Sequence, residues 1–282
     1  MEIVAEFTYN HLGDTARAIR MITEAKKAGA TCVKFELRNN KNYFRNNQKI
    51  RIKRDKYEFS LKQISAFVKH CKKENIDWFA SVHDIHSLNK IIPFHPKYIK
   101  IASREARSIA FLKKVKVINQ KKFPIIISTG ALTFKEIKAI YKLMKNEQLT
   151  LLHTLCLYPC DTEKLNMNRI MKMKKSFSCN IGYSGHEEGF IPSLYACFIG
   201  VDYIERHFTL EEQKGKVAKG KNNFKDDLCT LTPALFSEMT ASINMIEALK
   251  KQKISNSILP EELERVFAYG KLSWDGNDLF LK

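Results

Sequence analysis

The N-terminal residues 3–37, IVAEFTYNHLGDTARAIRMITEAKKAGATCVKFEL, contain one complete strand–helix–strand unit. The segments Ile3–Thr8 and Cys32–Leu37 are short apolar runs with β-branched and aromatic residues, which favour β-strands. Between them, apolar residues recur at helical spacing from Ala16 to Ala25. Because two parallel strands need a crossover connection, this order predicts a parallel βαβ unit.

The same alternation runs along most of the chain. Further helical stripes, such as Leu61–Val68 and Ile137–Met144, separate the later strands. Eight strand–helix units in about 250 residues are typical of a closed (β/α)8 TIM barrel of the α/β class. A doubly wound open sheet is the alternative, but no G-x-G-x-x-G motif follows the first strand. The remaining predicted strands are Trp78–Val82, Tyr98–Ser103, Pro124–Thr129, Leu149–Leu155, Asn180–Ser184 and Tyr203–Thr209.

The composition is that of a folded globular protein, with 44% hydrophobic and 28% charged residues among 282. No apolar run reaches the roughly 18 residues of a membrane span, and the start, MEIVAEFTYN, lacks the features of a secretory signal. We therefore expect a cytoplasmic protein without a membrane segment. The seven cysteines are scattered and form no C-x-x-C pair, which argues against a disulfide framework and a cysteine zinc site.

The formal net charge is +18, which raises the question of nucleic-acid binding. The lysines are spread over predicted helices, as in Lys113–Lys116 and Lys172–Lys175, and are not gathered in one tail or interleaved with aromatic residues. We therefore expect no nucleic-acid partner, and a nucleic-acid-binding barrel is left as a minor alternative. The positive charge should favour anionic substrates.

Three stretches interrupt the alternation. Asn39–Phe59 is polar and basic, and we expect it to be an extended loop on the active face after the second strand. Glu211–Phe224 is rich in lysine and glycine and is either a mobile lid or a tolerated surface insertion. The chain after Lys250 is less periodic. The predicted domains are therefore a barrel over residues 1–251 and a C-terminal arm over residues 252–282.

Polar and ionisable residues recur at the C-terminal ends of nearly all the predicted strands. Such residues inside apolar strands are costly unless they are paired or used, so the whole set predicts a polar pocket. For His153 taken alone, a satisfied core histidine is the better interpretation. The strand ends offer Glu6, Asn10, His11, Lys34, Glu36, His83, Asp84, Lys100, Ser103, Glu105, Ser128, Thr129, His153, Tyr158, Ser184, His186, Glu205 and His207.

Two kinds of chemistry follow from this set. Lysines and hydroxyls at the ends of strands two, four and five form a cationic cradle suited to a phosphate or a carboxylate; they are Lys34, Lys100, Ser103 and Ser128. His186 and His207, on adjacent strands, suit a divalent transition metal that activates a carbonyl oxygen. Glu6 stands on the first strand as a candidate acid or base. A Schiff-base lysine is the alternative chemistry.

Seven ordered segments resemble the sialic acid synthase family, and the match is collinear over Ile3–Ala248. The segments are VAEFTYNHLGD (Val4–Asp14), AGATCVKF (Ala28–Phe35), YIKIAS (Tyr98–Ser103), PIIISTG (Pro124–Gly130), LLHTLCLYP (Leu151–Pro159), IGYSGH (Ile181–His186) and IERHFT (Ile204–Thr209). The resemblance implies a barrel that condenses phosphoenolpyruvate with an N-acetylated aldose such as N-acetylmannosamine. The product would be a nonulosonic (sialic-acid-like) acid, with release of phosphate.

The resemblance also implies roles for individual residues. His186 and His207 match the two histidines that hold a divalent ion, expected here to be Mn²⁺, with Mg²⁺ or Co²⁺ as alternatives. Glu6 matches the family's catalytic glutamate. The expected substrate-binding residues are Lys34, Lys100, Ser103, Ser128, Tyr158, Ser184, Asn10 and Glu105. A homodimer is the family expectation.

The chain departs from the family pattern at several positions. Val82 replaces a ligand-contacting threonine and Cys156 an asparagine, so two polar contacts are expected to be lost. The usual S-D-H is S-G-H, at Gly185, and Phe224-Lys225-Asp226 replaces a G-P-D motif. We expect the family's C-terminal antifreeze-like domain to be absent, with Phe267–Trp274 resembling its linker. A diverged barrel with another aldehyde substrate or a binding role alone is therefore the alternative function.

Overall fold

The computed structural model describes residues 1–43, 46–145, 147–210, 228–253, 255, 257–266, 268, 272–274 and 279–281. Within it, eight parallel strands form a closed barrel in the order β1 to β8, and β8 pairs with β1 to close the ring. The predicted TIM barrel is thereby confirmed. The strands are β1 (Glu2–Glu6), β2 (Cys32–Leu37), β3 (Asp77–Val82), β4 (Ile99–Ile101), β5 (Ile125–Ser128), β6 (Leu149–His153), β7 (Asn180–Gly185) and β8 (Tyr203–His207).

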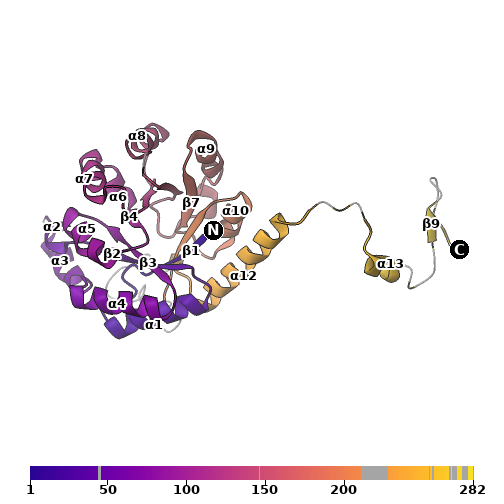
Figure 1. Ribbon diagram of the computed structural model, residues 1–282, viewed down its shortest axis with the longest axis horizontal. Helices are drawn as coiled ribbons and strands as arrows, with labels where there is room; N and C mark the ends of the chain where they lie inside the picture. Colours follow the sequence, from indigo (N-terminus) through magenta and orange to yellow (C-terminus); the bar gives the residue numbers. More distant parts are fainter. Residues whose placement is uncertain are drawn as a thin grey trace. The chain divides into compact units, whose positions relative to one another are not determined.

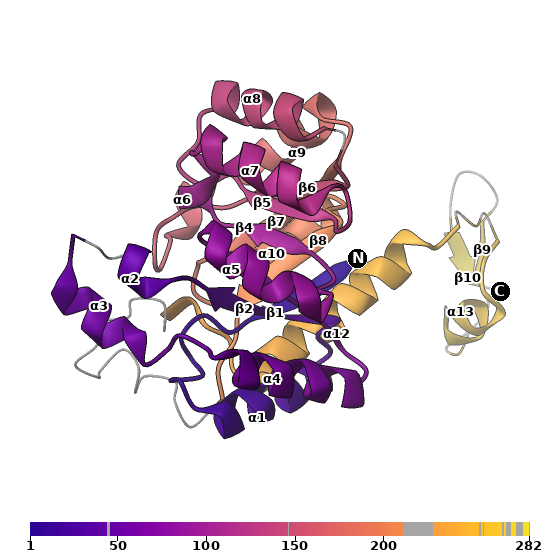
Figure 2. The same cartoon turned by 60° about the vertical axis from the view of Figure 1, so that its left-hand side comes forward.

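Helices surround the strands on the outside (Figures 1 and 2). Several begin where the sequence supplies a capping residue: the Asp14 side chain accepts hydrogen bonds from the first turn of α1, and Ser60 and Thr133 form capping boxes on α4 and α8. The helices are α1 (Thr15–Lys27), α2 (Asn40–Tyr43), α3 (Gln48–Asp55), α4 (Leu61–Lys73), α5 (Ile85–Ile91), α6 (Ser103–Ala106), α7 (Ile109–Asn119), α8 (Phe134–Met144), α9 (Asn168–Ser176), α10 (Ile191–Phe198) and α12 (Pro233–Lys250), with 3-10 turns at Ile92–Phe94 and Thr162–Lys164.

The barrel interior has an apolar layer below and a polar layer above. The apolar layer consists of Val4, Cys32, Phe79, Ile126, Leu152 and Tyr203. Side chains alternate between the two faces of a strand, so the residue two positions later also points inward. Those residues are Glu6, Lys34, Ser81, Ser128, Thr154 and Glu205, and all of them line one cavity. The alternation of the strands thus places polar groups at the C-terminal end of the barrel.

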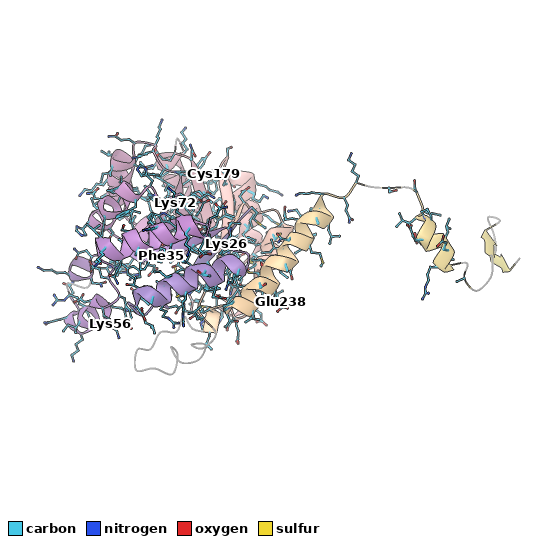
Figure 3. All side chains as sticks on the ribbon, turned by 60° about the horizontal axis from the view of Figure 1, so that its bottom comes forward. Lys26, Phe35, Lys56, Lys72, Cys179 and Glu238 are labelled. Atoms are coloured by element: carbon cyan, nitrogen blue, oxygen red, sulfur yellow. The ribbon has the colours of Figure 1, made fainter. Side chains whose placement is uncertain are left out.

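The outward faces of the strands pack against the helices and form the main hydrophobic core. The lysines lie mainly on the solvent side of those helices. Figure 3 shows two of them, Lys26 on α1 and Lys72 on α4, and both are exposed. The positive charge is therefore distributed over the helical shell, as the sequence indicated.

The segment Asn39–Phe59 is not an extended loop throughout, because it contains helices α2 and α3. Side-chain contacts hold it in place: the Asn40 amide donates a hydrogen bond to the carbonyl oxygen of Arg54, and the Arg54 guanidinium lies 3.9 Å from the centre of the Tyr9 ring. These contacts explain how a polar stretch without an apolar stripe folds. The predicted lid at residues 211–224 and the motif at 224–226 lie outside the described residues.

The chain divides into two compact units, Met1–Glu247 and Ala248–Lys282. The first is the barrel. The second contains α13 (Pro260–Val266) and a two-stranded antiparallel sheet of β9 (Leu272–Trp274) and β10 (Leu279–Leu281). Within the described residues, no helix is long and apolar enough to cross a membrane.

Candidate active site

A cavity of about 300 Å³ lies at the C-terminal ends of the barrel strands. All eight strands, or the residues directly after them, contribute to its wall. Of the residues predicted to be catalytic, substrate-binding or metal-binding, all except Asn10 line this cavity. In the wider set of strand-end residues, His11, Asp84, Thr129 and His153 also lie outside it. The predicted site residues that line the cavity are Glu6, Lys34, Lys100, Ser103, Glu105, Ser128, Tyr158, Ser184, His186 and His207.

Asn10 does not line the cavity. Its side-chain amide donates a hydrogen bond to the carbonyl oxygen of Phe208 (2.9 Å), and its own carbonyl oxygen accepts one from Arg17 Nε (2.5 Å). It therefore ties the loop after β1 to the segment after β8, and its predicted role in substrate binding stays a prediction. His153 is also outside the cavity: it is buried, and its Nε2–H donates to the carbonyl oxygen of Leu165 (2.7 Å).

Glu205 is the centre of the polar layer, although no feature of the sequence ranks it above other strand-end residues. Its carboxylate accepts hydrogen bonds from Lys100 Nζ (2.9 and 3.0 Å), Ser184 Oγ (3.0 Å) and the Tyr203 hydroxyl (3.0 Å), and it lies 3.0 Å from Lys34 Nζ. Burial alone would raise the pKa of Glu205, but Lys100 and Lys34 outweigh burial and hold it well below its ordinary value. One carboxylate thus fixes both lysines.

Lys34 bridges two carboxylates, because it also forms an ion pair with Glu6. Burial lowers the pKa of Lys34 to about 8, against the opposing effect of Glu205. The other oxygen of Glu6 accepts a hydrogen bond from the backbone N–H of Thr8 (2.9 Å), which fixes this carboxylate beside the ammonium group. Lys34 is therefore a buried cation whose charge is sensitive to what enters the cavity.

The cavity wall is balanced in charge rather than cationic. Its basic residues are Lys34, Arg38, Lys100 and Arg104, and its acidic residues are Glu6, Glu36, Glu105 and Glu205. The residues of the predicted cationic cradle all line the cavity, but both of its lysines are already paired with carboxylates. An entering anion would therefore share the lysines with Glu205 and Glu6.

His186 and His207 face each other across β7 and β8, with 5.1 Å between their ring centres. His186 Nδ1–H donates to the carbonyl oxygen of Leu155 (2.5 Å), which leaves its Nε2 lone pair available. The ring of Tyr158 lies 4.2 Å from that of His186. Burial lowers the pKa of His186 to about 4, and burial together with the neighbouring His186 lowers that of His207. Both rings are therefore neutral near pH 7, the form that binds metals.

These features fit a metal held by two imidazoles, because metal-binding histidines commonly donate their other N–H to a backbone carbonyl. Among the residues that the structure describes, no group of three or more His, Cys, Asp and Glu side chains is arranged to hold an ion. Two imidazoles alone would leave further coordination positions for substrate or water.

A second polar network lines the same cavity: Glu36, His83 and Glu105 belong to the predicted strand-end residues, whereas Arg38 and Tyr43 were not predicted. Arg38 pairs with Glu36 and donates a hydrogen bond to His83 Nε2 (3.3 Å), and His83 Nδ1–H donates to Glu105 (2.9 Å). The ring of Tyr43 meets that of His83 edge-on at 5.4 Å. The sequence signal for this network was again the alternation of side chains along a strand. Glu36 and Arg38 lie on the same face as Lys34, and His83 lies on the same face as Ser81.

The positions at which the chain departs from the family pattern lie in different parts of the structure. Val82 is fully buried in the hydrophobic core and does not line the cavity, whereas the preceding residue, Ser81, does. Cys156 does line the cavity. A side chain on Gly130 would place its Cβ 2.6 Å from Cys156 Sγ and 2.7 Å from Ser103 Oγ, so glycine is needed for this packing.

A family model, the NeuB family, matches residues 21–255. The chain belongs to the NeuB family. A relative from Drosophila melanogaster, N-acetylneuraminate-9-phosphate synthase, is 34% identical over 259 residues, covering 86% of this chain and 66% of the relative. N,N'-diacetyllegionaminic acid synthase from Campylobacter jejuni is 33% identical over 229 residues, covering 74% and 68%. The chain therefore spans about two thirds of the length of these curated relatives of the NeuB family.

A solved structure supports the same relationship. The crystal structure of an N-acetylneuraminic acid (sialic acid) synthetase from Leptospira borgpetersenii, in complex with citrate, superposes with a TM-score of 0.81 at 26% identity. The superposition covers 94% of this chain and 90% of that one. The resemblance to the sialic acid synthase family is thus confirmed for the barrel of this NeuB-family chain.

Proposed function

We propose that this NeuB-family chain condenses phosphoenolpyruvate with an N-acetylated aldose, such as N-acetylmannosamine or a related hexose, to give a nonulosonic acid and inorganic phosphate. The observation that carries the proposal is the meeting, in one cavity, of two lysines, several hydroxyls, a carboxylate and two neutral histidines. The relatives named for sialic and legionaminic acid synthesis support the same reaction class.

Phosphoenolpyruvate would bind at the side of the cavity formed by strands two, four and five. Lys34 and Lys100 supply the ammonium groups for its carboxylate and phosphate, and Ser128 supplies a hydroxyl. An anion adds an acceptor next to Lys34, which keeps its ammonium group charged. Glu205 holds both lysines in place before the substrate arrives, so little reorganisation is needed.

A divalent ion, Mn²⁺ or alternatively Mg²⁺ or Co²⁺, would be held by His186 and His207. When bound, such an ion polarises the aldehyde oxygen of the aldose as a Lewis acid. The protein contributes by keeping the imidazoles neutral through burial and by orienting His186 through the carbonyl oxygen of Leu155. Tyr158 and Glu105 also line the cavity, and we expect them to contact the aldose.

The reaction forms one C–C bond between C3 of phosphoenolpyruvate and the aldehyde carbon. Water then adds at C2, and the C2–O bond to phosphate breaks, so that the bridging oxygen leaves with phosphate. The proton lost by the water and the proton gained by the new hydroxyl balance. Glu6 is the group suited to accept the proton from water, because it is an ionised carboxylate in the cavity with one oxygen fixed by the Thr8 amide.

The test is phosphate release from phosphoenolpyruvate in the presence of a panel of N-acetylated hexoses, with and without Mn²⁺, and with mass analysis of the product. We expect release that requires both substrates and a product equal in mass to their sum plus water minus phosphate. Glu6→Gln should lose most of this activity while remaining folded. Failure of every aldose in the panel would overturn the proposal.

A diverged activity is the second candidate, favoured by Cys156 in the cavity wall where the family has asparagine. In that case the barrel would act on another aldehyde or only bind an acidic ligand. Calorimetry with phosphoenolpyruvate and Mn²⁺ separates the two: the synthase should bind phosphoenolpyruvate, and absence of binding would favour the diverged barrel.

A further inference from the structure

Arg206 is a fully buried arginine in β8, between Glu205 and His207 in sequence. Because side chains alternate along a strand, it points away from the cavity that its two neighbours line. Its guanidinium donates a hydrogen bond to Ser193 Oγ on α10 (3.1 Å). A buried charge of this kind is costly unless it is paired and hydrogen-bonded, so its partners are expected to be specific.

The partner of Arg206 is Glu187, which is also fully buried. Arg206 donates hydrogen bonds to the Glu187 carboxylate and, from Nη2, to the Glu187 carbonyl oxygen (2.8 Å). The Tyr183 hydroxyl donates to the other carboxylate oxygen (2.6 Å). The ion pair therefore joins β8 to the loop that follows β7, with hydrogen bonds on both sides.

Glu187 occupies the space of a missing side chain at Gly185. In the strand register, Gly185 is the direct partner of Arg206. A Cβ on Gly185 would lie 2.7 Å from both carboxylate oxygens of Glu187 and 2.8 Å from Tyr183 Cε1. The family motif has aspartate at this position, directly across from the arginine, so this chain provides the carboxylate from two residues later.

Each residue of this ion pair is a direct sequence neighbour of one of the two histidines. Glu187 directly follows His186, and Arg206 directly precedes His207. Arg206 Nη2 also donates to the carbonyl oxygen of Cys229 (3.3 Å), whose Sγ contacts His207 Nδ1 at 3.9 Å. One guanidinium group thus joins the residue after His186, helix α10 and Cys229, and the Cys229 side chain contacts His207.

We infer that Glu187 is a positioning residue that acts through Arg206 to set the placement of His186 and His207, and that it replaces the carboxylate absent at Gly185. The inference rests on the proposed metal role of the two histidines. A low-dielectric ion pair holds its partners at one spacing. Loss of a group hydrogen-bonded to a metal-binding histidine typically changes metal affinity by about 10–100-fold, and Glu187, which acts on the histidines through the backbone, is expected at the lower end of that range. Catalysis itself is assigned to the cavity residues, not to Glu187.

The test uses the full-length chain and measures Mn²⁺ affinity by calorimetry, independently of activity. Glu187→Gln keeps the size of the side chain and removes its charge, and we expect affinity to fall by about tenfold or more. The double variant Gly185→Asp with Glu187→Ala returns a carboxylate to the position opposite Arg206. Removal of Glu187 clears its oxygens from the space, and the Tyr183 ring, 2.8 Å from the added Cβ, must shift to admit it. We expect the double variant to recover most of the affinity that Glu187→Ala alone loses.

The control is Ile137→Ala, a core truncation on α8, which should leave Mn²⁺ affinity within about twofold because it touches neither histidine. Unchanged affinity in Glu187→Gln would overturn the inference, as would a double variant no better than Glu187→Ala. If the unaltered chain binds no Mn²⁺, the proposed metal role fails separately. In that case the ring ¹⁵N signals of His186 and His207 in metal-free protein test the positioning role of Glu187. Glu187→Gln should shift both signals, and two unshifted signals would contradict the inference.

Discussion

Glu205→Gln removes the negative charge that two buried lysines share. The carboxylate lies 2.9 Å from Lys100 Nζ and 3.0 Å from Lys34 Nζ, and both ammonium groups are at least 95% buried. After the substitution Lys34 retains Glu6, whereas Lys100 has no other carboxylate partner in the part of the chain that the structure describes. The substitution therefore leaves one buried cation unpaired.

The magnitude follows from that unpaired charge. Breaking a buried ion pair by removing one partner costs about 3–5 kcal/mol of unfolding free energy. Removing both partners costs less, so Lys100→Met combined with Glu205→Gln should be more stable than the sum of the single variants predicts, with a coupling energy of about 2 kcal/mol. Asp77→Asn is the matched surface control: it removes an exposed partner of Lys97 and should cost less than about 1 kcal/mol.

Equilibrium urea unfolding at pH 7.5 measures these differences. We expect the midpoint of Glu205→Gln to fall far more than that of Asp77→Asn, and inorganic phosphate to stabilise Glu205→Gln more than the unaltered chain, because the anion replaces the lost charge. A Glu205→Gln variant within about 1 kcal/mol of the unaltered protein would refute the assignment of Glu205 as the group that holds both lysines.

Three further predictions concern pH and specificity. The pKa of Lys34, lowered to about 8 by burial, predicts that kcat/KM for phosphoenolpyruvate decreases above pH 8, and a flat profile from pH 7 to 9.5 would contradict a charged Lys34 in binding. Burial lowers the pKa of His11 to about 3 and that of His153 to about 4, so both stay neutral in the folded state while the unfolded state takes up protons below pH 6.5. Stability is therefore complete above that pH and is lost as pH falls, by about 1.4 kcal/mol per histidine at pH 5.5, and urea unfolding at pH 7.5 and 5.5 should show the difference. Cys156→Asn should lower KM in the phosphate-release assay by up to about tenfold if its amide gains one hydrogen bond to substrate, whereas an unchanged KM would place substrate away from this wall.

The barrel could be predicted because parallel strands covered by helices require short apolar runs at regular intervals. The fourth strand was expected at Tyr98–Ser103 and is found at Ile99–Ile101, within the same run. The helices α2 and α3 could not be predicted, since their sequence has no apolar stripe. They depend on contacts such as that between Asn40 and Arg54, which become visible only in the folded chain.

The site was predictable to the extent that polar strand-end residues alternate with apolar ones. The pairing of these residues across the barrel could not be predicted, because Lys100 and Glu205 are 105 residues apart and meet only when the ring closes. For the same reason the sequence suggested a cationic cradle, whereas the lysines have carboxylate partners. The hydrogen bond from Asn10 to the carbonyl oxygen of Phe208, 198 residues away, could not be predicted for the same reason.

The most direct test of the proposed condensation follows the bridging oxygen of phosphoenolpyruvate. The chain is incubated with Mn²⁺, an N-acetylated hexose and phosphoenolpyruvate labelled with ¹⁸O between C2 and phosphorus, and the phosphate is analysed by mass spectrometry. Attack of water at C2 predicts that the label leaves with phosphate, and only when the hexose is present. Release of unlabelled phosphate would show cleavage at phosphorus, and release without hexose would show hydrolysis that is not coupled to condensation; either result would contradict the proposed reaction.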